Sequence, residues 1–502
     1  MKTKFLFLQS EHENIGIEYL SSALKKAGYG VNLLFIFKPI DGSTLKIFKS
    51  TKDRENNKIL KAIKDYEPDV VCFSPFTSQY LWSTEKAKFI KNKFPKIFNL
   101  FGGVHVNSVP EVVVKNKYVD GILVGEADRT IVEFAKKFKA KKYYLMESFW
   151  GKKGKKIVKN KIASLPNNLN RLPFPDKELF YSQLPLSFFD SSYVIMGSRG
   201  CPFMCTYCSN NVYQDLYRGQ KRLRFRDPNN IIEELVEAKK KYRFKRIEFM
   251  DDVLTIDYVR LEKLMKIYVK KIKLPFSCFL HPKFVTEKMI KLLEKSGCYW
   301  LKMGVQSANE EYRYKYLNRS ESNEKIVEAA KMCNKYGLKF SLDHIFNLPG
   351  ESKNDLIEAV KLYNECRPTI INFGSLIYLP KTKIIEYGLR EKIINQRDVV
   401  MINEGRDPIS LTPNMNRISL QSKHKEKVNI SAFSLLFILV SIFPKSFINF
   451  LLKIKFYDIS HNVNILILIF FKVISKIKAG QFYIYMSVLN GLLYFYEKRN
   501  ET

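Results

Sequence analysis

The sequence of 502 residues predicts an α/β protein with two regions of alternating strands and helices, followed by a mostly helical region. Short apolar segments alternate with amphipathic ones from the N-terminus to about residue 140, and again from about residue 190 to 385. This rhythm is typical of parallel sheets with helices packed on their faces. It stops after Glu391, where apolar segments interrupted by lysines begin. We therefore expect a domain at 1–140, a linker at 141–188, a second domain at 189–390 and a helical region at 391–502.

The N-terminal region contains apolar segments that predict five strands. Gly28 is placed to end the first helix. Strands joined by helices in this way predict a doubly wound, flavodoxin-like parallel sheet, which binds ligands at the carboxyl ends of its strands. The expected strands cover residues 4–8, 31–37, 69–74, 97–101 and 121–124, with helical segments such as 15–27 and 83–92 between them. The candidate ligand-binding residues at the strand ends are Ser74, Thr77, Gly102, Gly103, His105, Gly125 and Glu126.

The linker contains a turn sequence and a pair of prolines. Residues 150–154 are suited to a hairpin, and Pro173 and Pro175 favour extended backbone before Asp176. An extended strap between two domains is therefore expected.

The second region predicts a partial (β/α) barrel. Its first strand is expected at residues 193–196. Further helix and strand pairs follow at 231–242 and 246–250, 286–296 and 300–303, 324–336 and 339–343, and 356–366 and 370–373. In barrels of this kind the chemistry takes place at the carboxyl ends of the strands.

Three closely spaced cysteines, Cys201, Cys205 and Cys208, follow the first strand of the second region. Thiolates are soft ligands that hold iron–sulfur clusters, and three of them leave one iron of a four-iron cluster open. Three other interpretations of these cysteines are possible in principle. A zinc knuckle needs a second cysteine pair, and a thioredoxin-like motif would leave Cys201 idle. A four-cysteine ferredoxin would need a partner among the scattered cysteines, which are Cys72, Cys278, Cys298, Cys333 and Cys366.

The Cys-x3-Cys-x2-Cys spacing resembles the signature of the radical S-adenosylmethionine (SAM) superfamily. The resemblance implies a partial barrel of radical SAM type and a [4Fe–4S] cluster whose open iron binds SAM. It also implies that the reduced cluster splits SAM into methionine and a 5′-deoxyadenosyl radical, which removes hydrogen from an unactivated carbon. An external electron donor of the flavodoxin or ferredoxin type is then required.

Further residues of the second region match positions that contact SAM in this superfamily. Asp251 and Asp252 follow a strand and resemble the acidic motif that binds the SAM ammonium, with Asp251 expected to be the better contact; one of the two is alternatively a helix cap. Gln306 and Ser307 stand where relatives carry Glu-Ser. Arg319 is either a partner of the SAM carboxylate or a solvated arginine at a helix end. Tyr207, within the cysteine motif, completes the expected SAM-binding residues, and residues 345–351 resemble the turn that holds adenine.

The N-terminal region resembles the cobalamin (B12) binding domain that precedes many radical SAM domains. Residues 16–20, 102–105 and 119–126 carry the resemblance. The Asp-x-His-x-x-Gly motif that supplies a cobalt ligand in other cobalamin proteins is absent from the sequence. His105 is then either a cobalt ligand or pocket residue, or a loop histidine that forms hydrogen bonds.

Composition and charge limit the partners. Lysine and arginine number 84 against 50 acidic residues, a net charge of +34, but the surplus is spread along the chain and also fits an AT-rich coding sequence, so a nucleic-acid partner is not expected. Eight cysteines, most of them scattered, and a first strand in place of a signal peptide predict a cytoplasmic protein. The apolar segments 430–443 and 463–474 are shorter than the roughly 20 residues of a membrane span. They either cap or complete the core, or lie on an anionic membrane surface.

The sequence therefore predicts a radical SAM enzyme that performs cobalamin-dependent methyl transfer on a small-molecule substrate. If the C-terminal helices contact a membrane, a hydrophobic or lipid-like substrate and a peripheral location become attractive. Two alternatives remain: a cobalamin-free enzyme of cyclisation or rearrangement, and a membrane-associated iron–sulfur sensing protein. A methylthiotransferase is disfavoured, because that group carries extra cysteines in its N-terminal domain and this region has only Cys72.

Overall fold

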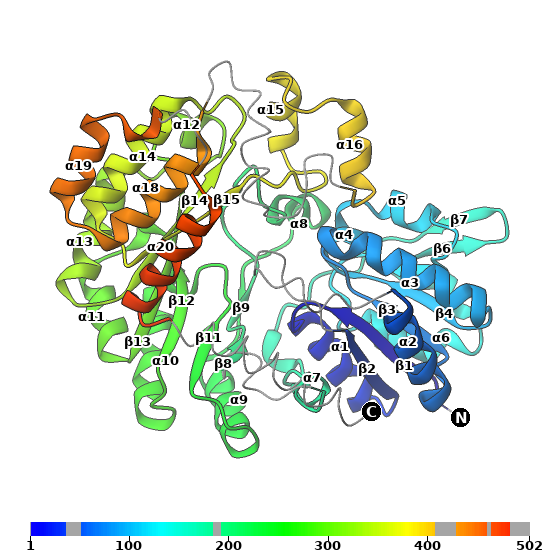
Figure 1. The fold of residues 1–502 in the computed structure, drawn as a ribbon. Helices are drawn as coiled ribbons and strands as arrows, with labels where there is room; N and C mark the ends of the chain where they lie inside the picture. The colour runs from blue at the N-terminus through cyan, green and yellow to red at the C-terminus, as the bar shows by residue number, and fades with distance from the viewer. Residues whose placement is uncertain (1, 37–51, 184–191, 407–427, 459–462, 482–502) are drawn as a thin grey trace. The chain divides into compact units, whose positions relative to one another are not determined.

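The chain forms two compact units, each completed by segments far apart in the sequence (Figure 1). The structure, a computed structural model, describes residues 2–36, 52–183, 192–406, 428–458 and 463–481. The first unit comprises 1–184, 207–224 and 378–412, and the second comprises 185–206, 225–377 and 413–502. These boundaries differ from the four consecutive segments expected from the sequence, because 207–224 and 378–412 pack with the N-terminal region.

The first unit is built on a seven-stranded sheet in the order β2-β1-β3-β4-β5-β6-β7. The first five strands are parallel, which confirms the doubly wound sheet. The predicted hairpin is formed by β6 and β7, which extend the sheet in antiparallel fashion. Residue 37, expected in the second strand, lies outside the described residues. The strands are β1 (Lys4–Ser10), β2 (Gly30–Ile36), β3 (Val70–Phe73), β4 (Phe98–Phe101), β5 (Gly121–Leu123), β6 (Phe149–Lys153) and β7 (Lys156–Lys159).

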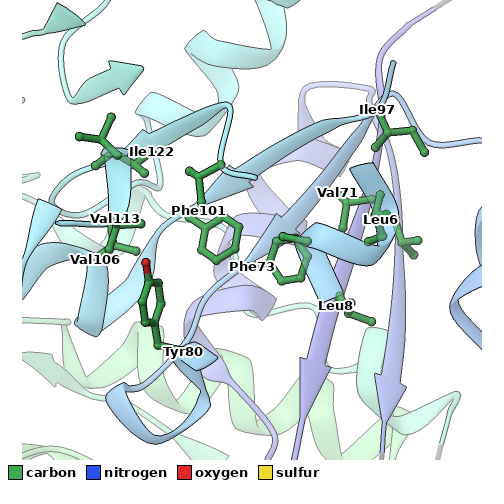
Figure 2. Close-up of a cluster of buried hydrophobic side chains, with 14 of the residues drawn as sticks. Leu6, Leu8, Val71, Phe73, Tyr80, Ile97, Phe101, Val106, Val113 and Ile122 are labelled. Atoms are coloured by element: carbon green, nitrogen blue, oxygen red, sulfur yellow. The ribbon is translucent and has the colours of Figure 1, made fainter. Parts of the chain in front are cut away.

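Helices cover this sheet and bury its apolar side chains. Asn14 caps the first helix by accepting a hydrogen bond from the Ile17 amide, and Gly28 follows its end with φ of 80°. Figure 2 shows the core, in which the rings of Phe73 and Phe101 stack with centroids 4.5 Å apart. The helices of this unit are α1 (Ile15–Lys26), α2 (Lys52–Tyr66), α3 (Tyr80–Lys93), α4 (Gly103–Ser108), α5 (Pro110–Lys115), α6 (Thr130–Phe138), α7 (Glu178–Tyr181), α8 (Asn210–Leu216), α15 (Ile384–Arg390) and α16 (Gln396–Asn403).

The second unit contains a six-stranded parallel sheet in the order β15-β14-β13-β12-β11-β8. This arrangement confirms the partial barrel. The strand β12 was not predicted, because its short apolar run begins directly after Pro275. The strands are β8 (Ser192–Ile195), β11 (Arg246–Phe249), β12 (Phe276–Leu280), β13 (Cys298–Gln306), β14 (Phe340–Phe346) and β15 (Ile370–Ser375), with the short β9 (Ser198–Arg199) and, at the unit boundary, β10 (Arg224–Phe225).

The helices between these strands begin at side-chain caps. Ser322 and Ser352 accept hydrogen bonds from the Lys325 and Asp355 amides and so fix the starts of α13 and α14. The helices of this barrel are α9 (Pro228–Lys241), α10 (Tyr258–Lys271), α11 (Glu287–Lys295), α12 (Glu310–Lys315), α13 (Asn323–Lys335) and α14 (Lys353–Cys366).

The C-terminal helices α18 (Ile430–Ile442), α19 (Lys445–Lys453) and α20 (Ile465–Lys478) belong to the second unit. α18 is buried from Ile430 to Ser441 and packs on β15, α14 and α20. Its Phe437 ring lies 5.1 Å from that of Phe346 and 5.2 Å from that of Tyr363. Of the two alternatives for segment 430–443, the core position is therefore correct. In the described part of the chain, every helix is too short or too polar to cross a membrane.

Candidate active site

The segment that carries Cys201 and Cys205 follows β8 and β9 in the second unit and is held by the segment before Arg319. The Thr206 amide donates to the Leu317 carbonyl at 3.2 Å, and the Asn318 amide nitrogen donates to the Met204 carbonyl at 3.0 Å. Cys201, Cys205 and Cys208 are half-buried thiols, as a loop that receives a cluster requires. Among the described residues, no three His, Cys, Asp or Glu side chains are gathered as a ready-made metal site. The assignment of the three cysteines to the cluster therefore stays a prediction, supported by their spacing and chemistry.

Arg319 lies beside one of these cysteines. Its Nη1 is 3.8 Å from Cys205 Sγ, its Nε pairs with Glu321 at 2.5 Å, and its Nη2 donates to the Gly304 carbonyl at 2.8 Å. The arginine is 8% exposed, so the alternative of a solvated helix-end arginine is wrong. The guanidinium brings positive charge to a sulfur that must be anionic to bind iron.

His281, which the sequence analysis missed, supports the same loop. Its ring stacks on that of Phe203 with centroids 4.1 Å apart, and its Nε2 lies 3.7 Å from Glu321 Oε2. Burial, with the positive charges of Arg319 and Lys283, lowers the pKa of His281 to about 3, so the ring is neutral. The available signal was a histidine directly after an apolar run, which was passed over because β12 was not recognised.

Asp251 and Asp252 occupy different environments. Asp251 is fully buried and accepts hydrogen bonds from the Gly197 amide at 2.9 Å and from the Ser198 hydroxyl. Burial raises the pKa of Asp251 despite these donors. This geometry makes Asp251 a support for the strand-to-loop turn, which differs from the direct SAM contact expected of it. Asp252 is exposed. Neither aspartate caps α10, because Asp257 is the residue that caps this helix.

Gln306 and Ser307 also differ in their surroundings. Gln306 is half-buried with φ of 70°, at a register shift between β13 and β14. Ser307 is buried, and its hydroxyl and carbonyl accept hydrogen bonds from Asn309 and Arg313. Ser307 thus builds the turn into α12. Gln306 and the half-buried Tyr207 remain candidates for contact with SAM. In the predicted adenine turn, Asn347 adopts φ of 60°.

In the first unit, Thr77 and His105 pack against each other in the segments that follow β3 and β4. His105 Nδ1 lies 3.2 Å from Thr77 Oγ1, and the His105 ring stacks on Tyr80 with centroids 4.2 Å apart. His105 is 0% exposed, and burial lowers its pKa to about 4. Of its two readings, this geometry favours the loop histidine over a cobalt ligand.

The loop after β5 is covered by the helix that follows the cysteines. The Gly125 amide donates to Asn107, whose side chain in turn donates to the Tyr213 hydroxyl, each at 2.7 Å. Glu126 pairs with Arg224, and its amide donates to the Tyr217 oxygen at 2.6 Å. Gly125 and Glu126, both predicted to bind a ligand, therefore form hydrogen bonds or ion pairs with other residues of the first unit.

Ser74, Gly102 and Gly103 remain half-exposed at the same edge. Gly103 has φ of 85°, and a Cβ there would lie 2.7 Å from Ser74 Oγ, so this close approach requires glycine. A half-exposed cradle of small residues suits the approach of a large planar cofactor. The role of these three residues toward cobalamin stays a prediction.

Two family models match the chain at the two units just described. The model of the radical SAM superfamily matches residues 195–363, and that of the B12 binding domain matches residues 6–135. The chain belongs to the radical SAM superfamily and carries a B12 binding domain. It is therefore an enzyme, which removes the sensing alternative. Its predicted cofactors, a [4Fe–4S] cluster, SAM and cobalamin, are confirmed at the level of the family. A small-molecule substrate and an external reductant are its partners.

Individual relatives of this radical SAM enzyme extend over most of the chain. An uncharacterized methyltransferase of Pyrococcus horikoshii is 25% identical over 76% of this chain and 79% of its own length. The anaerobic magnesium-protoporphyrin IX monomethyl ester cyclase of Cereibacter sphaeroides is 20% identical over 75% of this chain and 60% of its own length. The solved structure of OxsB, a cobalamin-dependent S-adenosylmethionine radical enzyme, matches with a TM-score of 0.66 at 15% identity, over 99% of this chain and 80% of OxsB. This last match shows a shared fold.

Proposed function

We propose that this radical SAM enzyme transfers a methyl group to an unactivated carbon of a small organic molecule with the help of cobalamin. One observation carries the proposal: α8, the helix that follows Cys208, is anchored on the strand ends of the B12 binding domain. Within the first unit, the Tyr213 hydroxyl accepts a hydrogen bond from the Asn107 side chain, and the Tyr217 oxygen accepts one from the Glu126 amide. The third cysteine is thus joined through one short helix to the edge where cobalamin is expected.

The names of the relatives support methyl transfer and leave a cyclisation as the alternative. The Pyrococcus horikoshii relative is named a methyltransferase, and its similarity extends over 76% of this chain. The relative from Cereibacter sphaeroides is named a cyclase, so a cyclisation or rearrangement stays the alternative reaction. The experiment below separates the two.

The chain's own residues have distinct roles in this proposal. Cys201, Cys205 and Cys208 hold the cluster, with Arg319 placing positive charge beside Cys205. Asp252, Gln306 and Tyr207 contact SAM, and Ser74, Gly102 and Gly103 face cobalamin. When bound, these groups supply a carbon-centred radical and a transferable methyl group. Asp251, Ser307, His105 and Thr77 hold the loops in place.

A cytoplasmic location with contact to a membrane surface is a further part of the proposal. All eight cysteines are thiols, which favours a reducing compartment. α19 and α20 expose Phe450 (54%) and Phe470 (60%), and lysines flank both helices, as in helices that lie on anionic membranes. Co-sedimentation with phosphatidylglycerol vesicles, but not with phosphatidylcholine vesicles, is expected. Equal absence from both pellets would remove the membrane and the lipid-like substrate from the proposal.

The test of function is cobalt retention followed by product analysis. The protein is reconstituted anaerobically with iron, sulfide and hydroxocobalamin, desalted, and assayed for cobalt per cluster. Near-stoichiometric cobalt, with S-adenosylhomocysteine among the products of SAM turnover, supports methyl transfer. An intact cluster that cleaves SAM without retaining cobalt would instead favour the cobalamin-free alternative.

Cluster loss is tested with a matched pair of cysteine variants. Cys205→Ala should lose iron and all SAM cleavage. Cys333→Ala should retain both, because Cys333 is buried in α13 and its pKa is raised to about 12, which makes it an inert core thiol.

A further inference from the structure

A cavity of about 250 Å³ lies between the edge strand of the barrel and the C-terminal helices. It is lined on one side by β15, the last strand of the sheet, and on the other by α18 and α20. All of these elements belong to the second unit. The lining residues are Ile370, Ile371, Asn372, Phe373, Ile438, Lys472, Ser475 and Lys476.

The polar side of this cavity carries positive charge only. Lys472 and Lys476 lie four residues apart on α20, hence on the same helix face, and no carboxylate is among the lining residues. The Lys476 ammonium donates to the neutral Gln481 amide at 2.7 Å. Lys472 has no acidic partner within the part of the chain that the structure describes. Two ammonium groups on one wall repel each other unless an anion lies between them.

Near the cavity lie a further cation, Lys302, and two carboxylates, Glu248 and Asp343. Lys302 on β13 also repels the Lys476 ammonium, and its own counter-ion, Glu248, pairs with it directly. Burial and the repulsion from Lys472 and Lys302 lower the pKa of Lys476 to about 8. The nearby carboxylate of Asp343 accepts a 3.0 Å hydrogen bond from the Asn372 side chain. The Asn372 amide nitrogen is thus used in this bond, while its side-chain carbonyl oxygen can accept from other donors.

The remaining wall of the cavity is mostly apolar and determines which second group a ligand must carry. Ile438 of α18 and Phe373 of β15 supply apolar surface, and the Ser475 side chain supplies a hydroxyl beside the lysines. A ligand that fits has an anionic group at α20 and an apolar body against α18. A dry structural void would be lined by apolar groups alone, whereas a cavity with a polar wall such as this one holds water or a ligand.

We propose that Lys472 and Lys476 bind a carboxylate or phosphate group of the substrate, so that the enzyme acts on an organic anion with an apolar body. The inference rests on the proposed function, since it names the substrate class of the same barrel. The C-terminal helices are then part of the substrate site as well as of the core.

The test measures binding to the reconstituted full-length enzyme without turnover, so that its outcome is independent of whether methyl transfer occurs. Hexanoate, hexyl phosphate and neutral 1-hexanol are titrated by calorimetry. We expect one or both anions to bind at least tenfold more tightly than the alcohol. Lys472→Met combined with Lys476→Met should abolish this preference, whereas Lys472→Arg combined with Lys476→Arg should keep it.

Lys478→Met on the same helix is the matched control, because Lys478 bonds to the Ile442 carbonyl and is not among the cavity-lining residues. It should leave anion affinity within twofold of the wild type. Tighter binding of hexanoate would assign a carboxylate, and tighter binding of hexyl phosphate a phosphate. Equal binding of alcohol and anions, absence of anion binding, or an anion preference that survives in the doubly substituted methionine variant would each overturn the proposal. Thermal melting of every variant shows whether a lost preference reflects unfolding.

Discussion

The backbone amide of Glu126 donates a 2.6 Å hydrogen bond to the phenol oxygen of Tyr217. The same oxygen fills the space above the α-carbon of Gly125, where a Cβ would overlap it. Tyr217 follows the end of α8, and Gly125 and Glu126 follow β5. An aromatic side chain from beyond the cysteine motif therefore closes the loop at the edge of the B12 binding domain.

Gly125→Ala is expected to lower the free energy of unfolding by several kcal/mol, because alanine at φ of 95° costs about 1–2 kcal/mol and its Cβ also overlaps Tyr217. Gly154→Ala is the control, since Gly154 has φ of 63° but no atom within 4 Å of the added Cβ. Tyr217→Phe should partly rescue Gly125→Ala. Urea denaturation and cobalamin retention are the measurements, and equal losses in the two alanine variants would contradict the expectation.

Arg319→Gln is expected to make the cluster harder to reduce, because it removes a positive charge 3.8 Å from Cys205 Sγ. The midpoint potential, followed by electron paramagnetic resonance, should shift to more negative values. Arg319→Lys should shift it less, since the charge is retained. Iron content per chain is measured in both variants. An unchanged potential at full iron content would show that Arg319 only supports the loop.

Lys177→Met is expected to lower the free energy of unfolding by about 3–5 kcal/mol, because it leaves two buried carboxylates without a counter-ion. The ammonium is 1% exposed and lies 2.6 Å from Glu13 and 2.8 Å from Glu18. Lys25→Met, which breaks a half-exposed pair with Asp176, should cost about 1 kcal/mol or less. Chemical denaturation of both variants at neutral pH checks the difference.

The burial of His344 predicts that the folded protein loses stability at acidic pH. Burial lowers the pKa of His344 to about 3, and its Nδ1 lies 2.8 Å from the Tyr363 hydroxyl. In the unfolded chain, His344 takes up a proton near pH 6.5, whereas in the folded protein it does so only near pH 3. The stability that neutral His344 contributes is therefore fully present above pH 6.5 and is lost as the pH falls toward 3. Between pH 7.5 and 5.5, His344→Gln should lose about 1.4 kcal/mol less stability than the wild type. Urea titrations at the two pH values measure this, and parallel losses would refute it.

Local patterns in the sequence predicted the parts of the fold that depend on neighbouring residues. The parallel strands and the cysteine spacing belong to this class. The cover of Gly125 by Tyr217 did not follow from the sequence, because it joins residues 92 positions apart whose contact depends on packing. The burial of Asp251 was missed for a similar reason: a carboxylate after a strand has the same pattern whether it faces a ligand or the Gly197 amide. His281 was missed because Pro275 concealed its strand.

The division of the chain into interleaved units also has a consequence for biosynthesis. Gly405, beyond the last strand of the barrel, packs against Tyr80 of the first unit. A chain leaving the ribosome therefore delivers all six barrel strands before the unit with the B12 binding domain has its final segment. We expect the corrin to be loaded after most of the polypeptide has been translated. For the same reason, no single break in the gene would yield two fragments that each encode one whole unit.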